Sequence, residues 1–223
     1  MRNFRTVKRG IERVRDVLTV KEFKRLLKSI DENTVLGIRD KSMLILLYGT
    51  GIRASELCGI KEKDINFEGF QLKVFGKGQR ERVVCLNNQV VKYLKKYMKV
   101  RGRISKDKLF FRTRLGAGVS RKGLYDRVKK YVRLAGINKV ISPHNIRHSF
   151  ATALIEGGKH TIVTIKKMLG HRSISSTIRY LRENPEDMRR AANMHPVNSF
   201  NDILNEYLPN VRMPFQLSRS SFK

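Results

Sequence analysis

The apolar segment from Leu36 to Tyr48, followed by Gly49-Thr50-Gly51, constrains the fold of this 223-residue chain more than any other feature. A helix that is apolar around most of its circumference belongs in a protein interior. The glycines that follow leave the backbone free to turn and end the helix. The segment therefore predicts a buried central helix, and the chain is long enough for one main domain with extensions.

Other periodic patterns predict the elements around this helix. Thr19 and Glu22 have capping-box spacing ahead of a helical apolar period, which predicts a helix over 20–31. Apolar and polar residues alternate over 65–86 on either side of Gly76-Lys77-Gly78, which predicts a small antiparallel sheet with Lys77 at a hairpin tip. Helical periods predict further helices at 88–101, 120–135, 143–157, 161–169, 174–181 and 185–193. The predicted fold class is mainly α with a small antiparallel β-sheet.

The charge balance points to a polyanionic partner. The chain has 48 Lys and Arg against 19 Asp and Glu, a formal net charge of +29. Such a charge repels itself unless a polyanion is bound, and nucleic acid is the leading candidate. The apolar fraction of 40% favours a folded protein over a disordered basic tail. Charge alone is equally compatible with a packing protein of the ribosomal or chromatin type and with a nucleic-acid enzyme.

Several classes of site are not indicated. Cys58 and Cys85 lie in apolar stretches without metal-ligand spacing, so we expect buried free thiols, a reducing compartment and no metal site. The longest apolar runs fall short of the roughly 20 residues that span a bilayer. The basic N-terminus has no apolar segment after it that would make a secretory signal. We expect a cytoplasmic protein without a membrane partner.

Three segments carry candidate functional residues. In the first, Ser142 is a plausible cap and Pro143 a first residue for a helix on which His144 and Arg147 share a face. An imidazole and a guanidinium so placed can meet one phosphate near the positive end of the helix. Such a pair is common by chance in a basic protein, and a solvated or capping role is the alternative. For His148 we expect a structural hydrogen bond.

The second segment is Gly51-Ile52-Arg53-Ala54-Ser55-Glu56-Leu57, in which a turn delivers an arginine three residues before a glutamate. Glu56 is placed to orient Arg53. A surface ion pair is the alternative, but an unpaired guanidinium between apolar segments is costly, which favours a functional role for Arg53.

The third segment contains Leu169-Gly170-His171, with Tyr180 nine residues after the histidine. An isolated tyrosine in a helix is usually a core residue with its hydroxyl at the rim. Tyr180 alone therefore indicates little.

Together, Arg53 with Glu56, Lys77 in its glycine turn, His144-x-x-Arg147, Leu-Gly-His171 and Tyr180 resemble the tyrosine recombinases, above all the Xer-type and phage-integrase branches. The likeness covers residues 19–196 in the family's order, and the joint match is more specific than any single element. It implies a tyrosine recombinase catalytic domain over 19–196.

The resemblance implies site-specific DNA recombination without metal or cofactor. Tyr180 would attack the scissile phosphate to give a 3′-phosphotyrosyl link, which a 5′-hydroxyl can reverse. Arg53 and Arg147 would bind the non-bridging oxygens.

The resemblance also implies the supporting roles. Lys77 would protonate the leaving 5′-oxygen, with Lys73 as the less favoured candidate. His144 and His171 would hydrogen-bond the phosphate and assist proton movement. Glu56 would support Arg53.

The two ends of the chain and five basic residues are further candidates for contacts with DNA or with another protomer. Residues 1–18 are predicted to be a basic arm or linker, and 197–223 a tail with an amphipathic helix. By resemblance the tail docks on a neighbouring protomer in a tetrameric synapse, with docking in cis as the alternative. Five basic residues are candidates for phosphate-backbone contacts, or else for a solvated helix face: Arg121, Lys122, Arg127, Lys129 and Lys130.

Two other functions stay open at this point. A type IB topoisomerase shares the tyrosine and arginine chemistry, and a non-catalytic DNA-binding module would have an inactive site. The N-terminal core-binding domain usual in these recombinases is not visible, so we expect either a catalytic fragment or a minimal enzyme. The sequence does not identify the DNA target, nor does it separate integration, excision and dimer resolution.

Overall fold

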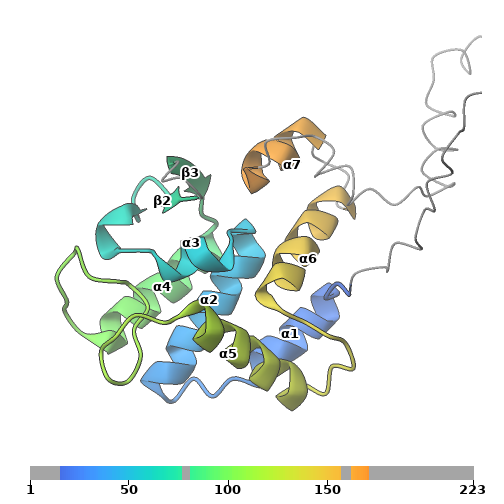
Figure 1. Ribbon diagram of the computed structural model, residues 1–223, viewed down its shortest axis with the longest axis horizontal. Coiled ribbons are helices and arrows are strands. Elements are labelled where there is room, and N and C mark those ends of the chain that lie inside the picture. The colour runs from blue at the N-terminus through green and yellow to red at the C-terminus, as the bar shows by residue number, and fades with distance from the viewer. Residues whose placement is uncertain (1–15, 77–80, 157–161, 171–223) are drawn as a thin grey trace, which may run out of the picture. The chain divides into compact units, whose positions relative to one another are not determined.

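The computed structural model describes residues 16–76, 81–156 and 162–170 (Figure 1). The helices predicted at 174–181 and 185–193, the hairpin tip and the C-terminal tail lie outside these residues. The described elements run in the order α1 (Val20–Lys28), α2 (Val35–Thr50), α3 (Ala54–Cys58), the 3₁₀ turn η1 (Glu62–Asp64), β1 (Ile65–Asn66), β2 (Gln71–Phe75), β3 (Glu81–Cys85), α4 (Asn88–Arg101), α5 (Arg121–Leu134), α6 (Pro143–Glu156) and α7 (Ile162–Leu169). The predicted fold class, mainly α with a small antiparallel sheet, is confirmed.

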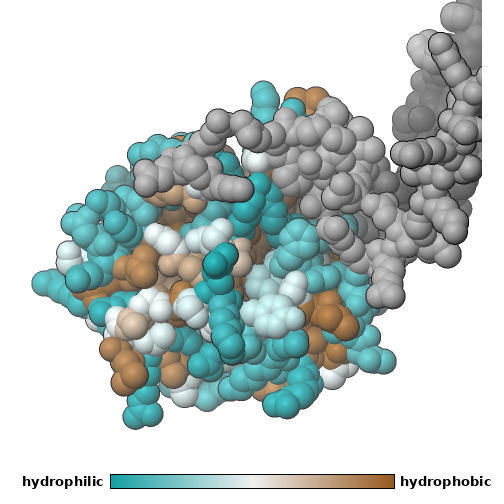
Figure 2. Space-filling model, in the orientation of Figure 1, coloured by the Kyte–Doolittle hydropathy of each residue, from teal (hydrophilic) through white to brown (hydrophobic). Residues whose placement is uncertain are grey.

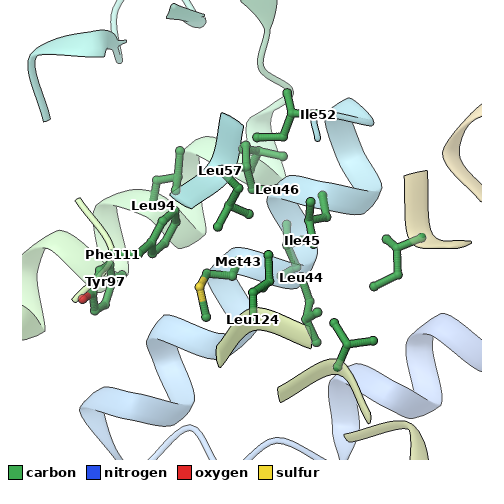
Figure 3. Close-up of a cluster of buried hydrophobic side chains, with 14 of the residues drawn as sticks. Met43, Leu44, Ile45, Leu46, Ile52, Leu57, Leu94, Tyr97, Phe111 and Leu124 are labelled. Carbon is green, nitrogen blue, oxygen red and sulfur yellow. The ribbon is translucent and has the colours of Figure 1, made fainter. Parts of the chain in front are cut away.

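Helix α2 is the predicted central helix. Every residue from Gly37 to Leu47 is buried, and α2 packs against α4 on one side and α6 on the other (Figure 1). Figure 3 shows Met43 and Leu46 of α2 in one cluster with Leu94 of α4 and Leu124 of α5. Fully burying a side chain of this size contributes about 1.5–3 kcal/mol to the free energy of folding. Because α2 buries several of them, it supplies much of the stabilisation of the core.

The end of α2 is set by Gly51. Gly51 has φ 63° and ψ 24°, a left-handed conformation that glycine adopts without a Cβ penalty, and its N–H donates to Leu47 O at 2.9 Å. A Cβ at this position would lie 2.3 Å from Cδ1 of Phe150 on α6. The close approach of α6 thus also requires glycine, and the turn delivers the chain to Arg53.

The sheet has the order β1-β2-β3 with antiparallel pairing throughout. Leu72 and Val74 of β2 are buried together with Val84 of β3, and the alternate residues face outward. Cys85 is one of the outward residues and is exposed, so our expectation of a buried thiol is wrong there. Cys58 on α3 is partly buried, and burial raises the pKa of its thiol, with Arg121 nearby opposing that rise.

The start of the described chain is attached to α6. The amide of buried Leu18 donates to Ser149 Oγ at 2.8 Å, and Asn145 Nδ2 donates to Asp16 O at 2.9 Å. Helix α1 then begins with the predicted capping box, in which the Glu22 amide donates to Thr19 Oγ1 at 3.2 Å. The arm predicted for residues 1–18 lies mostly outside the described residues and stays a prediction.

The face drawn in Figure 2 is largely polar where the structure describes it. Figure 2 shows hydrophilic residues over most of the described part of the visible face, with apolar residues in scattered groups. Among the described residues, no helix is both long enough and apolar enough to cross a membrane.

Candidate functional site

The N-terminus of α6 presents the first pair of candidate residues. Ser142 and Asn145 cap the helix reciprocally, with the Asn145 amide donating to Ser142 Oγ at 3.4 Å and the Ser142 amide to Asn145 Oδ1 at 3.1 Å. Pro143 is the first helical residue, as predicted. His144 in the first turn is exposed, whereas Arg147 is only 4% exposed. The Nδ1 of His148 lies 3.4 Å from Thr152 Oγ1, and this hydrogen bond is within helix α6.

Arg147 connects the ends of two other helices. Its Nη1 donates to the Gly51 carbonyl at the end of α2. Its Nη2 donates to the Leu169 carbonyl at the end of α7, at 2.7 Å. A guanidinium is planar and carries its donors in a fixed fork, so two such bonds define its orientation. Arg147 is therefore held in place by residues far from it in the sequence.

Arg53 and Glu56 form the second pair. Arg53 precedes the first turn of α3 and donates to Glu56 twice, from its amide to Oε2 at 2.7 Å and from Nη1 to Oε1 at 2.9 Å. The Glu56 side chain is fully buried, but that of Arg53 is 43% exposed. Our argument that Arg53 is buried is wrong: the turn places the carboxylate inside and leaves the guanidinium facing outward, where it can reach a ligand.

Arg82 on β3 is a third arginine in this cluster, and sequence reasoning missed it. Its Nη1 donates to Glu56 Oε1 at 2.8 Å and its Nη2 to Oε2 at 3.1 Å. Burial lowers the pKa of Arg82; Glu56 opposes that shift and the Arg53 charge adds to it. The alternation of the strand offered a signal, because Arg82 shares its face with buried Val84.

The turn after α7 brings the arginines together. Gly170 has φ 63°, and its carbonyl accepts a 3.4 Å bond from Arg53 Nη2, next to the Leu169 carbonyl that Arg147 binds. A Cβ on Gly170 would lie 2.7 Å from Arg82 Nε. Residues from α3, β3, α6 and α7 therefore converge at the end of α2.

Three predicted catalytic residues cannot be located in this cluster. Lys77, His171 and Tyr180 lie outside the described residues. In sequence, Lys77 falls between β2 and β3, and His171 directly follows Gly170. Lys73, the alternative to Lys77, pairs with Glu81 at 2.9 Å, and both side chains are 46% exposed.

The five basic candidates on α5 have different surroundings. Arg121 is the first residue of α5, which packs against α3, and its charge opposes the rise in the pKa of the Cys58 thiol. Lys122 pairs with Asp126 at 3.0 Å, Lys129 lies over the Tyr125 ring at 5.0 Å, and Lys130 lies over Tyr131 at 5.4 Å. Arg127 lies 3.8 Å from Asp40, which is buried and also accepts a 2.8 Å bond from the Tyr131 hydroxyl. Arg127 thus has a structural partner, whereas Arg121 is exposed beside α3.

Metal ligands are not clustered in the part of the chain that the structure describes: no three His, Cys, Asp or Glu side chains there are grouped to hold an ion. The charged groups that meet at the site are guanidiniums with one shared carboxylate. Such a site is suited to binding an anion with several oxygens, such as a phosphodiester.

Comparison with known proteins agrees with this chemistry. Residues 16–187 match the model of the phage integrase family. The tyrosine recombinase XerD of Staphylococcus haemolyticus is 39% identical over 186 residues, which cover 81% of this chain and 63% of the relative. XerD of Staphylococcus aureus is 38% identical over the same length. The chain thus spans less than two thirds of the length of these curated relatives.

Solved structures give the same result. The crystal structure of XerA recombinase superposes with a TM-score of 0.69 and 28% identity, covering 81% of this chain and 65% of XerA. The XerH site-specific recombinase bound to a palindromic difH substrate, a post-cleavage complex, has a TM-score of 0.67 and 26% identity over 80% of this chain and 52% of XerH. The fold is that of a tyrosine recombinase catalytic domain, as predicted. The chain belongs to the phage integrase family.

Proposed function

We propose that this protein carries out site-specific DNA recombination by cleaving and rejoining strands through a 3′-phosphotyrosyl intermediate. The observation that carries the proposal is the convergence of Arg53 and Arg147 on adjacent carbonyls at Leu169 and Gly170, immediately before His171. The 39% identity to XerD supports recombination over the type IB topoisomerase alternative.

The two arginines bind the scissile phosphate in this proposal. Arg147 is fixed by Gly51 and Leu169, and Arg53 is open to solvent beside it. Charge builds up on the non-bridging oxygens as the attacking oxygen approaches, and preoriented guanidiniums stabilise that charge without reorganising. Glu56 holds Arg53 from the buried side.

The remaining roles follow the order of bond changes. The Tyr180 phenol oxygen attacks phosphorus, the bond to the 5′-oxygen breaks, and Lys77 supplies the proton that the departing oxygen takes up. His144 and His171 hydrogen-bond the phosphate and assist proton movement, taking up the proton that the phenol loses on attack and returning it when Tyr180 is released. The phosphotyrosyl ester keeps the bond energy, so attack by a 5′-hydroxyl releases Tyr180 and reseals a strand without metal or nucleotide.

DNA and a second protomer are the proposed partners. The XerH site-specific recombinase was solved bound to a difH substrate, and the charge of +29 here favours a nucleic-acid ligand. Arg121, exposed at the start of α5 where that helix packs against α3, would contact the DNA backbone, with Lys122, Arg127, Lys129 and Lys130 further along the helix. The segment 197–223 would dock on a neighbouring protomer in a tetramer on DNA.

A covalent-adduct assay tests the proposal. Duplexes bound by the protein are selected from a random-sequence library, nicked next to the candidate cleavage positions, and incubated with protein in EDTA. We expect a denaturation-resistant protein–DNA adduct with the unaltered chain and none with Tyr180→Phe. Tight binding without adduct would identify a non-catalytic DNA-binding module instead.

A second assay separates recombination from relaxation. Two duplexes with the selected site yield exchanged strands if the protein is a recombinase. Relaxation of a supercoiled plasmid without any strand exchange would favour the topoisomerase alternative.

A further inference from the structure

We propose that Arg82 is a positioning residue for the phosphate-binding Arg53 and that it acts through the carboxylate of Glu56. This inference rests on the proposed function and adds a residue to its site. The Arg82 guanidinium donates to both Glu56 oxygens, at 2.8 and 3.1 Å. Arg53 binds the same two oxygens, from Nη1 at 2.9 Å and from its backbone amide at 2.7 Å. One buried carboxylate thus joins two guanidiniums.

The geometry makes Arg53 depend on Arg82. Rotation of a glutamate carboxylate about its last bond is soft, so a partner must define the plane of that group. The Arg53 amide holds one oxygen, and the two-point bond from Arg82 holds both and so defines the plane. Arg53 has a long, 43% exposed side chain, whose guanidinium is held by Glu56 and by a weak 3.4 Å bond to Gly170. Tilting the carboxylate would therefore redirect Arg53.

The electrostatics act in the same direction. Two guanidiniums share one carboxylate, so the cluster keeps an excess of positive charge on the side where Arg53 is open. The side chain of Arg82 is 19% exposed, so its charge is screened less by salt than that of a surface residue. Arg82 thus raises the attraction of the cluster for an anion while the Arg82 side chain stays inside.

Arg82 also contacts a second part of the site. Its Nε, Cδ and Cζ would lie 2.7, 2.9 and 3.1 Å from a Cβ on Gly170, so the guanidinium rests against the turn that precedes His171. The Nε has no hydrogen-bond partner among the described residues. Arg82 therefore joins strand β3, which follows Lys77 in the chain, to α3 and to the end of α7.

The test compares Arg82→Met and Arg82→Lys with a matched control, Arg101→Met. Arg101 also has a buried guanidinium paired with a glutamate, Glu62, and it lies 4.7 Å from the Phe110 ring centroid. It lines a cavity with Val35 at the start of α2, the opposite end of that helix from Gly51. Arg101→Met therefore reports the general effect of losing a buried arginine.

Two DNA probes are used with each variant: the selected nicked duplex, and the same duplex with one non-bridging oxygen of the scissile phosphate replaced by methyl. Single-turnover adduct formation, DNA affinity and thermal unfolding are measured. If Arg82 positions Arg53, Arg82→Met slows adduct formation on the phosphodiester on the order of 10²-fold, as expected for a misplaced group, with affinity nearly unchanged. Arg82→Lys keeps the charge without the fork, so it recovers only the electrostatic part of the effect and stays well below the rate of the unaltered protein.

The methylphosphonate separates positioning from a merely structural role. It lacks one charged oxygen for Arg53 to stabilise, so the cost of Arg82→Met shrinks to a few-fold on this probe. In a Glu56→Gln background, Arg82→Met adds little, because both changes disturb the same contact. In the double variant residue 56 is an uncharged amide, so the loss of Arg82 does not remove a charged partner from a buried carboxylate. Adduct formation can therefore be measured in the double variant even if Arg82→Met alone folds poorly.

The outcomes distinguish the two proposals. If the unaltered protein forms no adduct, the proposed function fails. If it does form one, but Arg82→Met is slowed only as much as Arg101→Met, or equally on both probes, Arg82 has no positioning role and the proposed function stands.

Discussion

Glu56 is buried and Arg53 is open, although only two residues separate them in the sequence. Arg53 lies ahead of the first turn of α3, where the backbone is still extended, and Glu56 lies within that turn with its side chain directed inward. The buried carboxylate is acceptable because Arg53 and Arg82 supply it with charged donors. Local geometry at one helix start therefore decides which charge meets solvent.

Gly51 is the residue whose substitution we expect to be most damaging to the arrangement around Arg147. Gly51→Ala forces alanine into a left-handed conformation and places Cβ 2.3 Å from Phe150 Cδ1. Gly136→Ala is the matched control, since Gly136 has φ +60° and nothing within 4 Å of the added Cβ. Overpacking typically costs about 1–3 kcal/mol beyond the backbone strain. Urea unfolding of both variants measures the difference, and equal losses would show that the Phe150 contact relaxes freely.

At the scale of elements, helix α6 is hydrogen-bonded to two different parts of the chain. Arg147 connects it to the ends of α2 and α7. Ser149 and Asn145 connect it to residues 16–18. The helix that carries His144 and Arg147 is thus tied to the segment through which any preceding domain would be attached.

Ser149→Ala tests the connection between α6 and the start of the domain. The change removes the acceptor of the Leu18 amide, and leaving a buried donor unsatisfied costs about 1–3 kcal/mol. Ser105→Ala, at an exposed loop position, should change stability by no more than about 0.5 kcal/mol. Urea midpoints with an unchanged m-value provide the comparison, and a neutral Ser149→Ala would mean that water replaces the hydroxyl.

Glu32 makes the packing of α2 against α4 sensitive to acid. Hydrogen bonds from Lys41 of α2 and Lys96 of α4 lower the pKa of Glu32 from its ordinary value of 4.5. Because the folded pKa is the lower one, the stabilisation is present above pH 4.5 and is lost as the pH falls below 4.5 through the folded value. Glu32→Gln should flatten the loss of stability in that window. Unfolding measured from pH 6 to 3 tests this, with Glu68→Gln, an exposed carboxylate, as the control.

At the scale of the whole molecule, the net charge of +29 predicts DNA binding that weakens steeply with salt. Each phosphate contact releases counterions when the protein binds. The slope of log affinity against log salt concentration is about −0.9 per contact, so removing one contact makes the slope shallower by about 0.9. The described surface is largely polar on the face that Figure 2 shows, which suits such a ligand.

Arg121→Ala should lower this salt slope by about 0.9 and weaken binding to all duplexes alike. Arg103→Ala is the comparison: Arg103 is also exposed but follows α4, between Arg101 and Ile104, which line the cavity at the start of α2, remote from Gly51. Fluorescence anisotropy at several salt concentrations measures both slopes. Equal slopes for Arg121→Ala and the unaltered protein would remove Arg121 from the DNA interface.

The sequence by itself determined the local structure of the described chain. The capping box at Thr19, the start of α6 at Pro143, the central helix and the small sheet are all as predicted, because neighbouring residues set caps, turns and periodicity. Helix α1 ends at Lys28 and not at residue 31, and the Ser29 hydroxyl that follows also bonds to distant Tyr131. The order of the motifs also predicted the family and its fold.

Only the tertiary structure decided how the charged side chains combine. Arg147 meets the carbonyl of Gly51, 96 residues away in sequence, and Arg82 meets Glu56, 26 residues away. Neither contact follows from spacing along the chain, because both depend on how α6 and β3 pack around the end of α2. Packing also reversed the expected burial of Arg53 and exposed Cys85, since a side chain's surroundings are set by distant segments that no local pattern specifies.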